Sequence, residues 1–185
     1  NPKIPRSIGL DEKKPYFVLR FVALKAHHDT SAEGLSRKAI AELVKRLTVV
    51  GPVVITTEGA LSPEFREFQY RLPPENLHDL LAFASLYVGD SQTVAAEAAV
   101  LGVPSIRCNS FVGKISYLKE LEDRYRLTRG FLPWELDQLY TTVDTWLQNL
   151  GDVRRRTYQR RQKMLSECVD VSDWQWNLLC NTLHQ

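Results

Sequence analysis

The sequence predicts an α/β fold with three layers, in which helices cover both faces of a mainly parallel sheet. The apolar run at residues 16–24 is typical of a strand that is buried on both faces. Residues 86–88, a capped helix and residues 105–108 follow one another through short turns, which is the order of a strand–helix–strand unit. The stretches 36–49 and 134–150 carry apolar residues at helical spacing and supply outer layers.

The strand–helix–strand unit at residues 87–106 organises the chain. Asp90 and Ser91 are residue types that cap helix N-termini, and Gly102 stands where a helix ends in a left-handed conformation. Parallel sheets bind ligands at the carboxyl ends of their strands, and the free N–H groups of a helix N-terminus suit phosphate. The sequence therefore predicts a phosphate site at Gly89, Asp90, Ser91, Gln92 and Thr93.

Glu97 is the only charged residue in this otherwise apolar helix. It lies about two turns beyond the predicted phosphate site, where a carboxylate can accept both hydroxyls of a ribose. A solvent-exposed helix glutamate explains the same position equally well. The residues alone leave both interpretations open.

The run at residues 90–98, followed by Leu-Gly-Val-Pro at 101–104, resembles the nucleotide-binding signature of the C-terminal domain of GT-B enzymes. It is most similar to that of the non-hydrolysing UDP-N-acetylglucosamine 2-epimerases. Over residues 16–131, which include FVALKAHHD and NSFVGK, the chain more closely resembles an uncharacterised archaeal and bacterial family related to lipid-A-disaccharide synthase. Both resemblances imply a Rossmann-like domain, the C-terminal half of a GT-B fold.

The epimerase resemblance implies that Ser91 and the following backbone hold a diphosphate and that Glu97 holds the ribose. Gln92 and Thr93 stand where that family has two glycines, and their side chains narrow the approach of a phosphate to the backbone. The loop after the first strand carries a histidine–arginine pair in the epimerases. The resemblance therefore implies that His27 or His28 approaches phosphate, although a pair of loop histidines without a ligand is the alternative.

Other polar residues stand near predicted strand ends. Glu58 follows the strand at residues 52–57 and is expected at the rim of a nucleoside site. Lys114 lies in another carboxyl-end loop, where it is either a phosphate or sugar partner or a surface lysine. The resemblance places the backbone around Arg71 beside the nucleotide base. Arg20 interrupts the first strand, and its expected mid-strand position favours a structural ion pair over a ligand contact.

The composition excludes several classes of protein. The net charge of +2 gives no general argument for nucleic acid, and no apolar run reaches the ~18 residues of a membrane helix. The three cysteines have no metal-site spacing and predict reduced thiols in a cytoplasmic protein. The adjacent histidines point opposite ways on an extended segment, so no metal is expected. No cofactor is expected beyond a nucleotide-sugar that serves as substrate.

The expected organisation is a linker at residues 1–14, a nucleotide-sugar-binding domain at 15–150 and C-terminal helices at 151–185. GT-B enzymes have two Rossmann-like domains, so the chain is interpreted as the second, with Trp174 and Trp176 facing a missing first one. The basic run between Arg154 and Lys163 predicts a solvated helix face, with a contact to nucleic acid or to an anionic membrane surface as the minority alternative. A homo-oligomer stays open.

The function expected from these features is the nucleotide-sugar-binding half of a GT-B glycosyltransferase or sugar epimerase, with a UDP-sugar or similar donor. No catalytic base is assigned, because the resemblance implies that it lies on the other domain. The alternative is a non-catalytic module that keeps the fold as a nucleotide sensor or assembly part. The replacement of two glycines by Gln92 and Thr93 mildly favours that alternative.

Overall fold

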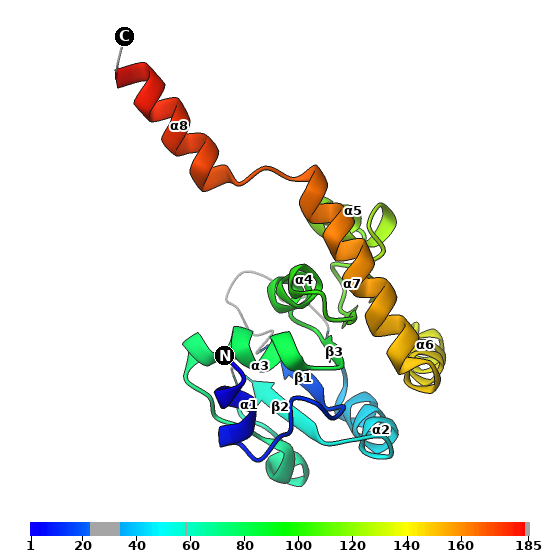
Figure 1. Cartoon of the computed structure of the whole chain (residues 1–185). Helices are drawn as coiled ribbons and strands as arrows, with labels where there is room; N and C mark the ends of the chain where they lie inside the picture. Colours follow the sequence, from blue (N-terminus) through cyan, green and yellow to red (C-terminus); the bar gives the residue numbers. More distant parts are fainter. Residues whose placement is uncertain (23–33, 58, 184–185) are drawn as a thin grey trace.

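The computed structural model describes residues 1–22, 34–57 and 59–183, which contain a five-stranded parallel sheet with helices on both faces (Figure 1). The three-layer α/β prediction is therefore confirmed. The strands are β1 (Phe17–Phe21), β2 (Val53–Thr57), β3 (Leu86–Gly89), β4 (Ser105–Cys108) and β5 (Thr128–Phe131). The helices are α1 (Lys3–Ser7), α2 (Arg37–Thr48), α3 (Leu77–Phe83), α4 (Gln92–Leu101), α5 (Ser116–Asp123), α6 (Leu136–Gln148), α7 (Leu150–Glu167) and α8 (Val171–Leu183), with short 3-10 helices η1 (Pro63–Phe68) and η2 (Pro74–Asn76).

The order of the strands places a crevice between β1 and β3. The sheet runs β2-β1-β3-β4-β5, so the chain passes from β1 to one side and later returns to the other side. The helix after β1, α2, packs on one face of the sheet, and the helix after β3, α4, packs on the opposite face. The helices that follow β1 and β3 along the chain therefore cover opposite faces of the sheet. Open α/β sheets bind ligands at such a switch point.

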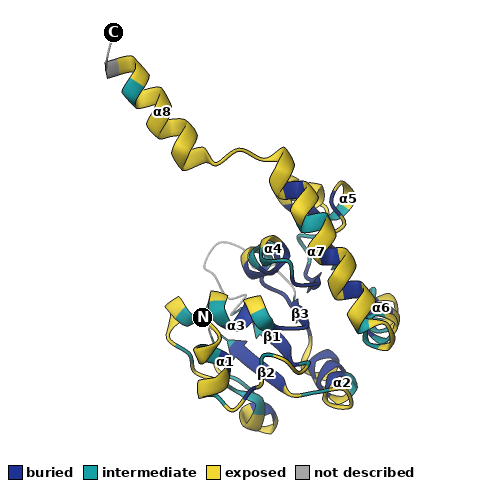
Figure 2. Ribbon diagram, viewed as in Figure 1, coloured by how far each residue is buried: buried dark blue, intermediate teal, exposed yellow. Residues whose placement is uncertain are grey.

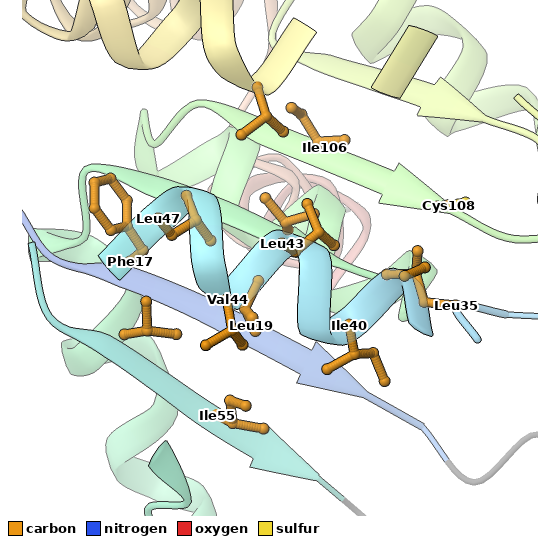
Figure 3. Packing of buried hydrophobic residues seen from close by; sticks show 14 of the residues in the cluster. Phe17, Leu19, Leu35, Ile40, Leu43, Val44, Leu47, Ile55, Ile106 and Cys108 are labelled. Atoms are coloured by element: carbon orange, nitrogen blue, oxygen red, sulfur yellow. The ribbon is translucent and has the colours of Figure 1, made fainter. Parts of the chain in front are cut away.

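Side chains along β1 alternate between the two helical layers. Phe17, Leu19 and Phe21 pack in the cluster that contains α2 and α6, whereas Tyr16 and Val18 pack with α3 and α4. Figure 3 shows α2 lying across the sheet above Leu19 and Ile55. Its buried stripe is the one that the spacing predicts: Ile40, Leu43, Val44 and Leu47.

Arg20 continues this alternation on the face of α3 and α4. The predicted strand at residues 16–24 ends at Phe21, and residues 23–33 lie outside the described part of the chain. Arg20 is thus the penultimate residue of β1, and its predicted mid-strand position was wrong. The difference matters because the end of a parallel strand is where ligands bind.

The first fourteen residues, expected as a linker, include the short helix α1, which contacts α3. Leu10 is buried in the same core cluster as Tyr16 and Leu80. This segment therefore packs on the domain through apolar contacts.

Helices α5 and α7 lie beside α4 at the β5 end of the sheet. Leu118, Leu121 and Met164 form a buried cluster there with Ala99 of α4. The basic run falls on α7, and two of its members donate to backbone carbonyls of other segments. Arg160 donates to the carbonyl of Arg126, and Arg161 donates to the carbonyl of Val100 at the end of α4.

One further prediction of local structure was wrong. The predicted helix at 134–150 is divided by Asn149, which ends α6 and precedes α7, so Gly151 lies in the first turn of the next helix. Gln69 forms an isolated parallel bridge with Ile55. Tyr117 is 48% exposed, because the buried stripe of α5 runs through Leu118 and Leu121.

Helix α8 extends away from the sheet and is exposed along its length (Figure 2). Trp174 and Trp176 are 57% and 68% exposed, and Leu178 and Leu179 are also exposed. The apolar surface of α8 is therefore without a partner within the described chain.

In the described residues, no helix is long and apolar enough to cross a membrane.

Candidate nucleotide-binding site

A hollow of about 570 Å³ lies at the carboxyl ends of β1 and β3. Strand β1 contributes Arg20, the residue after it contributes Val22, and α3 contributes Leu77 and His78. Pro74 of η2 and Phe111 add to the wall, and the rest of it comes from the turn after β3 and from α4. The hollow brings together five residues predicted from the sequence: Asp90, Ser91, Gln92, Thr93 and Glu97.

Ser91 is the N-cap of α4, as predicted. Its backbone is extended, and its Oγ accepts a hydrogen bond from the N–H of Val94 at 3.3 Å. The N–H groups of Gln92 and Thr93 donate to no residue in the described part of the chain. The start of α4 therefore presents unpaired donors, with the positive end of the helix dipole, to the hollow.

Asp90 has a structural partner. Its side chain is buried, and its Oδ1 accepts the N–H of Val22 at 2.8 Å, while the Asn109 amide donates to its carbonyl. Gly89 does not line the hollow. A Cβ at Gly89 would lie 2.3 Å from the Arg20 carbonyl oxygen, so only glycine permits this approach of β3 to β1.

Gln92 occupies part of the space that a glycine would leave open. Its side chain is half-buried and lines the hollow, and its Oε1 is buried without a hydrogen-bond partner among the described residues. Thr93 is exposed at the same wall. A buried amide oxygen without a partner costs free energy unless a ligand or water donates to it.

Glu97 projects from α4 into the same hollow. Its Oε2 lies 3.3 Å from Nε2 of His78 on α3. The side chain of Glu97 is 32% exposed and that of His78 is 61% exposed, so the pair stands at the mouth of the hollow. Sequence reasoning did not identify His78, because nothing in the α3 sequence indicates which residue of α4 it faces.

A second hollow, of about 430 Å³, adjoins the first and shares Arg20, Pro74 and Leu77 with it. Arg71, predicted to lie beside the nucleotide base, lines this second hollow together with Tyr70. The Arg20 guanidinium therefore lies where the two hollows meet. The alternation that places Tyr16 and Val18 on the α3 and α4 face would have predicted this position of Arg20.

The remaining predicted residues lie beside the hollow or outside the described residues. Lys114 is exposed and lies 5.6 Å from the centre of the Phe111 ring, and Phe111 lines the hollow. His27, His28 and Glu58 fall outside the described residues. Lys114 therefore approaches the site from its rim.

The described residues offer no group of three or more His, Cys, Asp and Glu side chains that could hold a metal ion. Cys108, at the end of β4, is buried, and burial raises the pKa of its thiol to about 12. A thiol with that pKa is protonated at neutral pH and does not act as a nucleophile. The hollow itself offers helix N–H donors, a guanidinium and a carboxylate–imidazole pair, which are groups that bind anions and hydroxyls.

Solved structures with a similar fold establish the fold class of this chain. The calicheamicin glycosyltransferase CalG4 superimposes on this chain with a TM-score of 0.55 and 17% sequence identity. The match covers 84% of this chain and 40% of CalG4. The UDP-GlcNAc 2-epimerase from Neisseria meningitidis, bound to UDP-GlcNAc, gives 0.55 at 12% identity over 89% and 46% of the two chains. The fold is that of a GT-B domain.

A variant of the wall teichoic acid polymerase TagF gives a TM-score of 0.53 at 13% identity over 87% of this chain and 40% of that one. The chain thus spans less than half the length of the GT-B structures that it matches. No protein-family model matches the sequence, and no curated protein matches it. At these identities the likeness establishes the fold and carries no residue roles.

Proposed function

We propose that this domain binds a nucleotide-sugar and forms the donor-binding half of a GT-B enzyme. The observation that carries the proposal is that Ser91 and Glu97 line one hollow at the switch point of the sheet. Glu97 stands six positions after Ser91, which is roughly 9 Å along the helix axis. That span is comparable to the distance between a diphosphate and the ribose attached to it.

The diphosphate is placed at the N-terminus of α4. The unpaired N–H groups of Gln92 and Thr93 and the helix dipole stabilise negative charge there. The Oγ of Ser91 fixes the first turn by capping Val94 and lies at the wall of the hollow. We include Gly89 and Asp90, which shape the turn, and Lys114, His27 and His28 as further candidates around the phosphates.

The nucleoside is placed along α4 and toward the second hollow. Glu97 accepts the ribose hydroxyls, in bonds worth about 1.5–3 kcal/mol each because the acceptor is charged. The second hollow, lined by Tyr70 and Arg71, receives the base, and Glu58 stays a candidate for its rim. Support for a UDP-sugar comes from the structural likeness to the 2-epimerase that was solved with UDP-GlcNAc.

The reaction that suits such a domain is glycosyl transfer or epimerisation at the sugar. In both reactions the bond between the sugar and the nucleoside diphosphate weakens or breaks. The α4 N-terminus then stabilises the negative charge that develops on the diphosphate. We assign no catalytic base, and we place it on a first Rossmann-like domain that packs against this one. The exposed apolar surface of α8, with Trp174 and Trp176, is the surface that we propose for that contact.

A relation to lipid-A-disaccharide synthase, a cytoplasmic location and a homo-oligomer remain predictions from the sequence. The second candidate function is a non-catalytic nucleotide-binding or assembly module. The half-buried Gln92 favours it, because this side chain occupies space beside the N–H donors of α4. Turnover of a nucleotide-sugar by the protein joined to a first domain would discriminate between an enzyme and such a module.

Calorimetry of the wild-type chain, Ser91→Ala and Glu97→Gln against UDP and inorganic diphosphate tests the proposal. Glu97→Gln keeps the size of the side chain and removes its charge, so UDP affinity should fall by about one to two decades while diphosphate affinity stays unchanged. Ser91→Ala should weaken both ligands. Glu120→Gln, on the exposed face of α5, is the matched control and should change neither.

The outcomes separate the parts of the proposal. Equal losses for UDP and diphosphate in Glu97→Gln would remove Glu97 from the ribose site and return it to a surface role. Binding of neither ligand by the wild-type chain would contradict nucleotide binding by this domain. Unchanged affinities in Ser91→Ala would move the phosphates away from the α4 N-terminus.

A further inference from the structure

His78 and Glu97 come from different helices and meet at the mouth of the hollow. Nε2 of His78 and Oε2 of Glu97 are 3.3 Å apart, which is within the distance of an ion pair when the imidazole is protonated. The imidazole thus lies against one oxygen of the carboxylate. A carboxylate has two oxygens and about four lone-pair sites, so Glu97 retains acceptor capacity for a ligand.

The position of this pair is fixed by the core beneath it. Helices α3 and α4 contact each other, and Leu80 and Leu81 pack in one buried cluster with Val94 and Ala98. His78 stands one turn from these leucines on α3, and Glu97 stands next to Ala98 on α4. The distance between the backbones of the two residues is therefore set by buried apolar contacts, which keep His78 within reach of Glu97.

Two acidic side chains line the hollow among the described residues, Asp90 and Glu97. Oδ1 of Asp90 already accepts the Val22 N–H, so we consider Glu97 as the carboxylate that accepts a ligand. A glutamate without a partner samples many rotamers and loses that freedom when it binds a ligand. A partner that holds the carboxylate before the ligand arrives removes part of this cost.

We propose that His78 is a positioning residue that holds the Glu97 carboxylate against α3 and thereby makes the site selective for a ribonucleoside diphosphate over its 2′-deoxy counterpart. This inference rests on the proposed function, in which Glu97 accepts ribose hydroxyls. A preorganised carboxylate loses more when one of the two hydroxyls is missing, because its geometry is matched to the diol. A freely rotating carboxylate accepts the remaining hydroxyl equally well and discriminates less.

The experiment compares UDP, 2′-deoxy-UDP and inorganic diphosphate by calorimetry on the full chain. His78→Leu keeps the approximate size and removes the donor, whereas His78→Gln retains an N–H donor near the position of Nε2. His78 is mostly exposed, so both variants should fold, and circular dichroism and the unfolding midpoint confirm this. Each ligand is measured on the same preparations.

The wild-type chain should bind UDP about tenfold more tightly than 2′-deoxy-UDP, as expected for one charge-assisted hydrogen bond. His78→Leu should reduce this ratio to about two- to threefold while diphosphate affinity stays unchanged, and His78→Gln should restore most of the ratio. In the Glu97→Gln background, His78→Leu should have no further effect on the ratio, since His78 acts through Glu97.

An unchanged ratio in His78→Leu would overturn the role of His78 and leave nucleotide binding intact. The role of His78 would also be overturned if His78→Leu reduced the ratio by the same factor in the Glu97→Gln background as in the wild type. His78 would then contact the ligand directly. Failure of the wild-type chain to bind UDP contradicts the proposed function itself, and the inference falls with it.

Discussion

The Asp90 carboxylate joins the ends of β3 and β1, because its Oδ1 accepts the backbone N–H of Val22 at 2.8 Å. Asp90 is only 5% exposed, so its removal leaves the half-buried N–H of Val22 without this acceptor. Asp90→Ala should lower the free energy of unfolding by about 1–3 kcal/mol. Urea unfolding followed by circular dichroism measures the loss.

Asp90→Asn is the control for this prediction. The asparagine keeps an oxygen in the place of Oδ1, so the hydrogen bond to Val22 survives and the loss of stability should be clearly smaller. Equal losses in the two variants would mean that the negative charge, rather than the acceptor, stabilises the turn.

The central unit could be predicted from the sequence because its signals are local. Ser91 caps α4, Gly102 ends it in a left-handed conformation with φ of 86°, and both roles depend on residues within a few positions along the chain. The stripe of α2 likewise follows from helical spacing alone. The turn that begins α4 could therefore be predicted without knowledge of the tertiary structure.

The rest of the site could not be predicted, because it depends on which elements pack together. The pairing of His78 with Glu97 exists only because α3 lies against α4. The division of α6 from α7 at Asn149 was missed since apolar spacing continues across it. Arg20 was misplaced because the end of β1 is not marked by a glycine or proline.

The basic run on α7 includes a residue that caps another helix. Arg161 donates from Nε to the Val100 carbonyl at 2.5 Å, at the end of α4 where carbonyls lack intrahelical partners. Arg161→Met keeps most of the apolar stem and should lower the free energy of unfolding by about 0.5–1.5 kcal/mol. Arg155→Met is the matched control, because Arg155 pairs only with the exposed Asp152 and should cost less than about 0.5 kcal/mol. Similar losses of unfolding free energy in both variants would show that the Arg161 contact stabilises the fold no more than the exposed pair of Arg155.

A buried ion pair links β4 to α5. The Arg107 guanidinium, 1% exposed, lies 2.7 Å from Glu122, which also accepts the N–H of Gly130. Glu122→Gln leaves the buried guanidinium without a counter-charge and should destabilise the fold by about 3 kcal/mol or more. Chemical unfolding measures this effect.

The neighbouring Glu120 provides the comparison for Glu122. Its pair with Arg124 is half exposed on each side, so Glu120→Gln should cost about 0–1 kcal/mol. If Glu122→Gln cost no more than Glu120→Gln, Arg107 would have to reach water or another acceptor when Glu122 is neutralised.

Helix α8 should contribute little to the stability of the domain on its own. None of its side chains between residues 171 and 182 is buried, and Trp174 and Trp176 are both more than half exposed. Removal of residues 171–185 should therefore change the free energy of unfolding by no more than about 0.5 kcal/mol. The control is Met164→Ala on α7, where a buried side chain packs against α5 and its loss should cost about 2–5 kcal/mol.

The proposed contact of α8 with a first domain gives the same truncation a second expected result. An apolar helix of this length is marginal in water and gains stability when another surface covers it. In a protein that carries both domains, removal of α8 should expose apolar surface on the first domain and weaken its association with this one, as measured by sedimentation of separately expressed domains. A loss above about 2 kcal/mol in the single domain would instead show that α8 packs on the sheet domain itself, and would transfer the two tryptophans from the domain contact to its core.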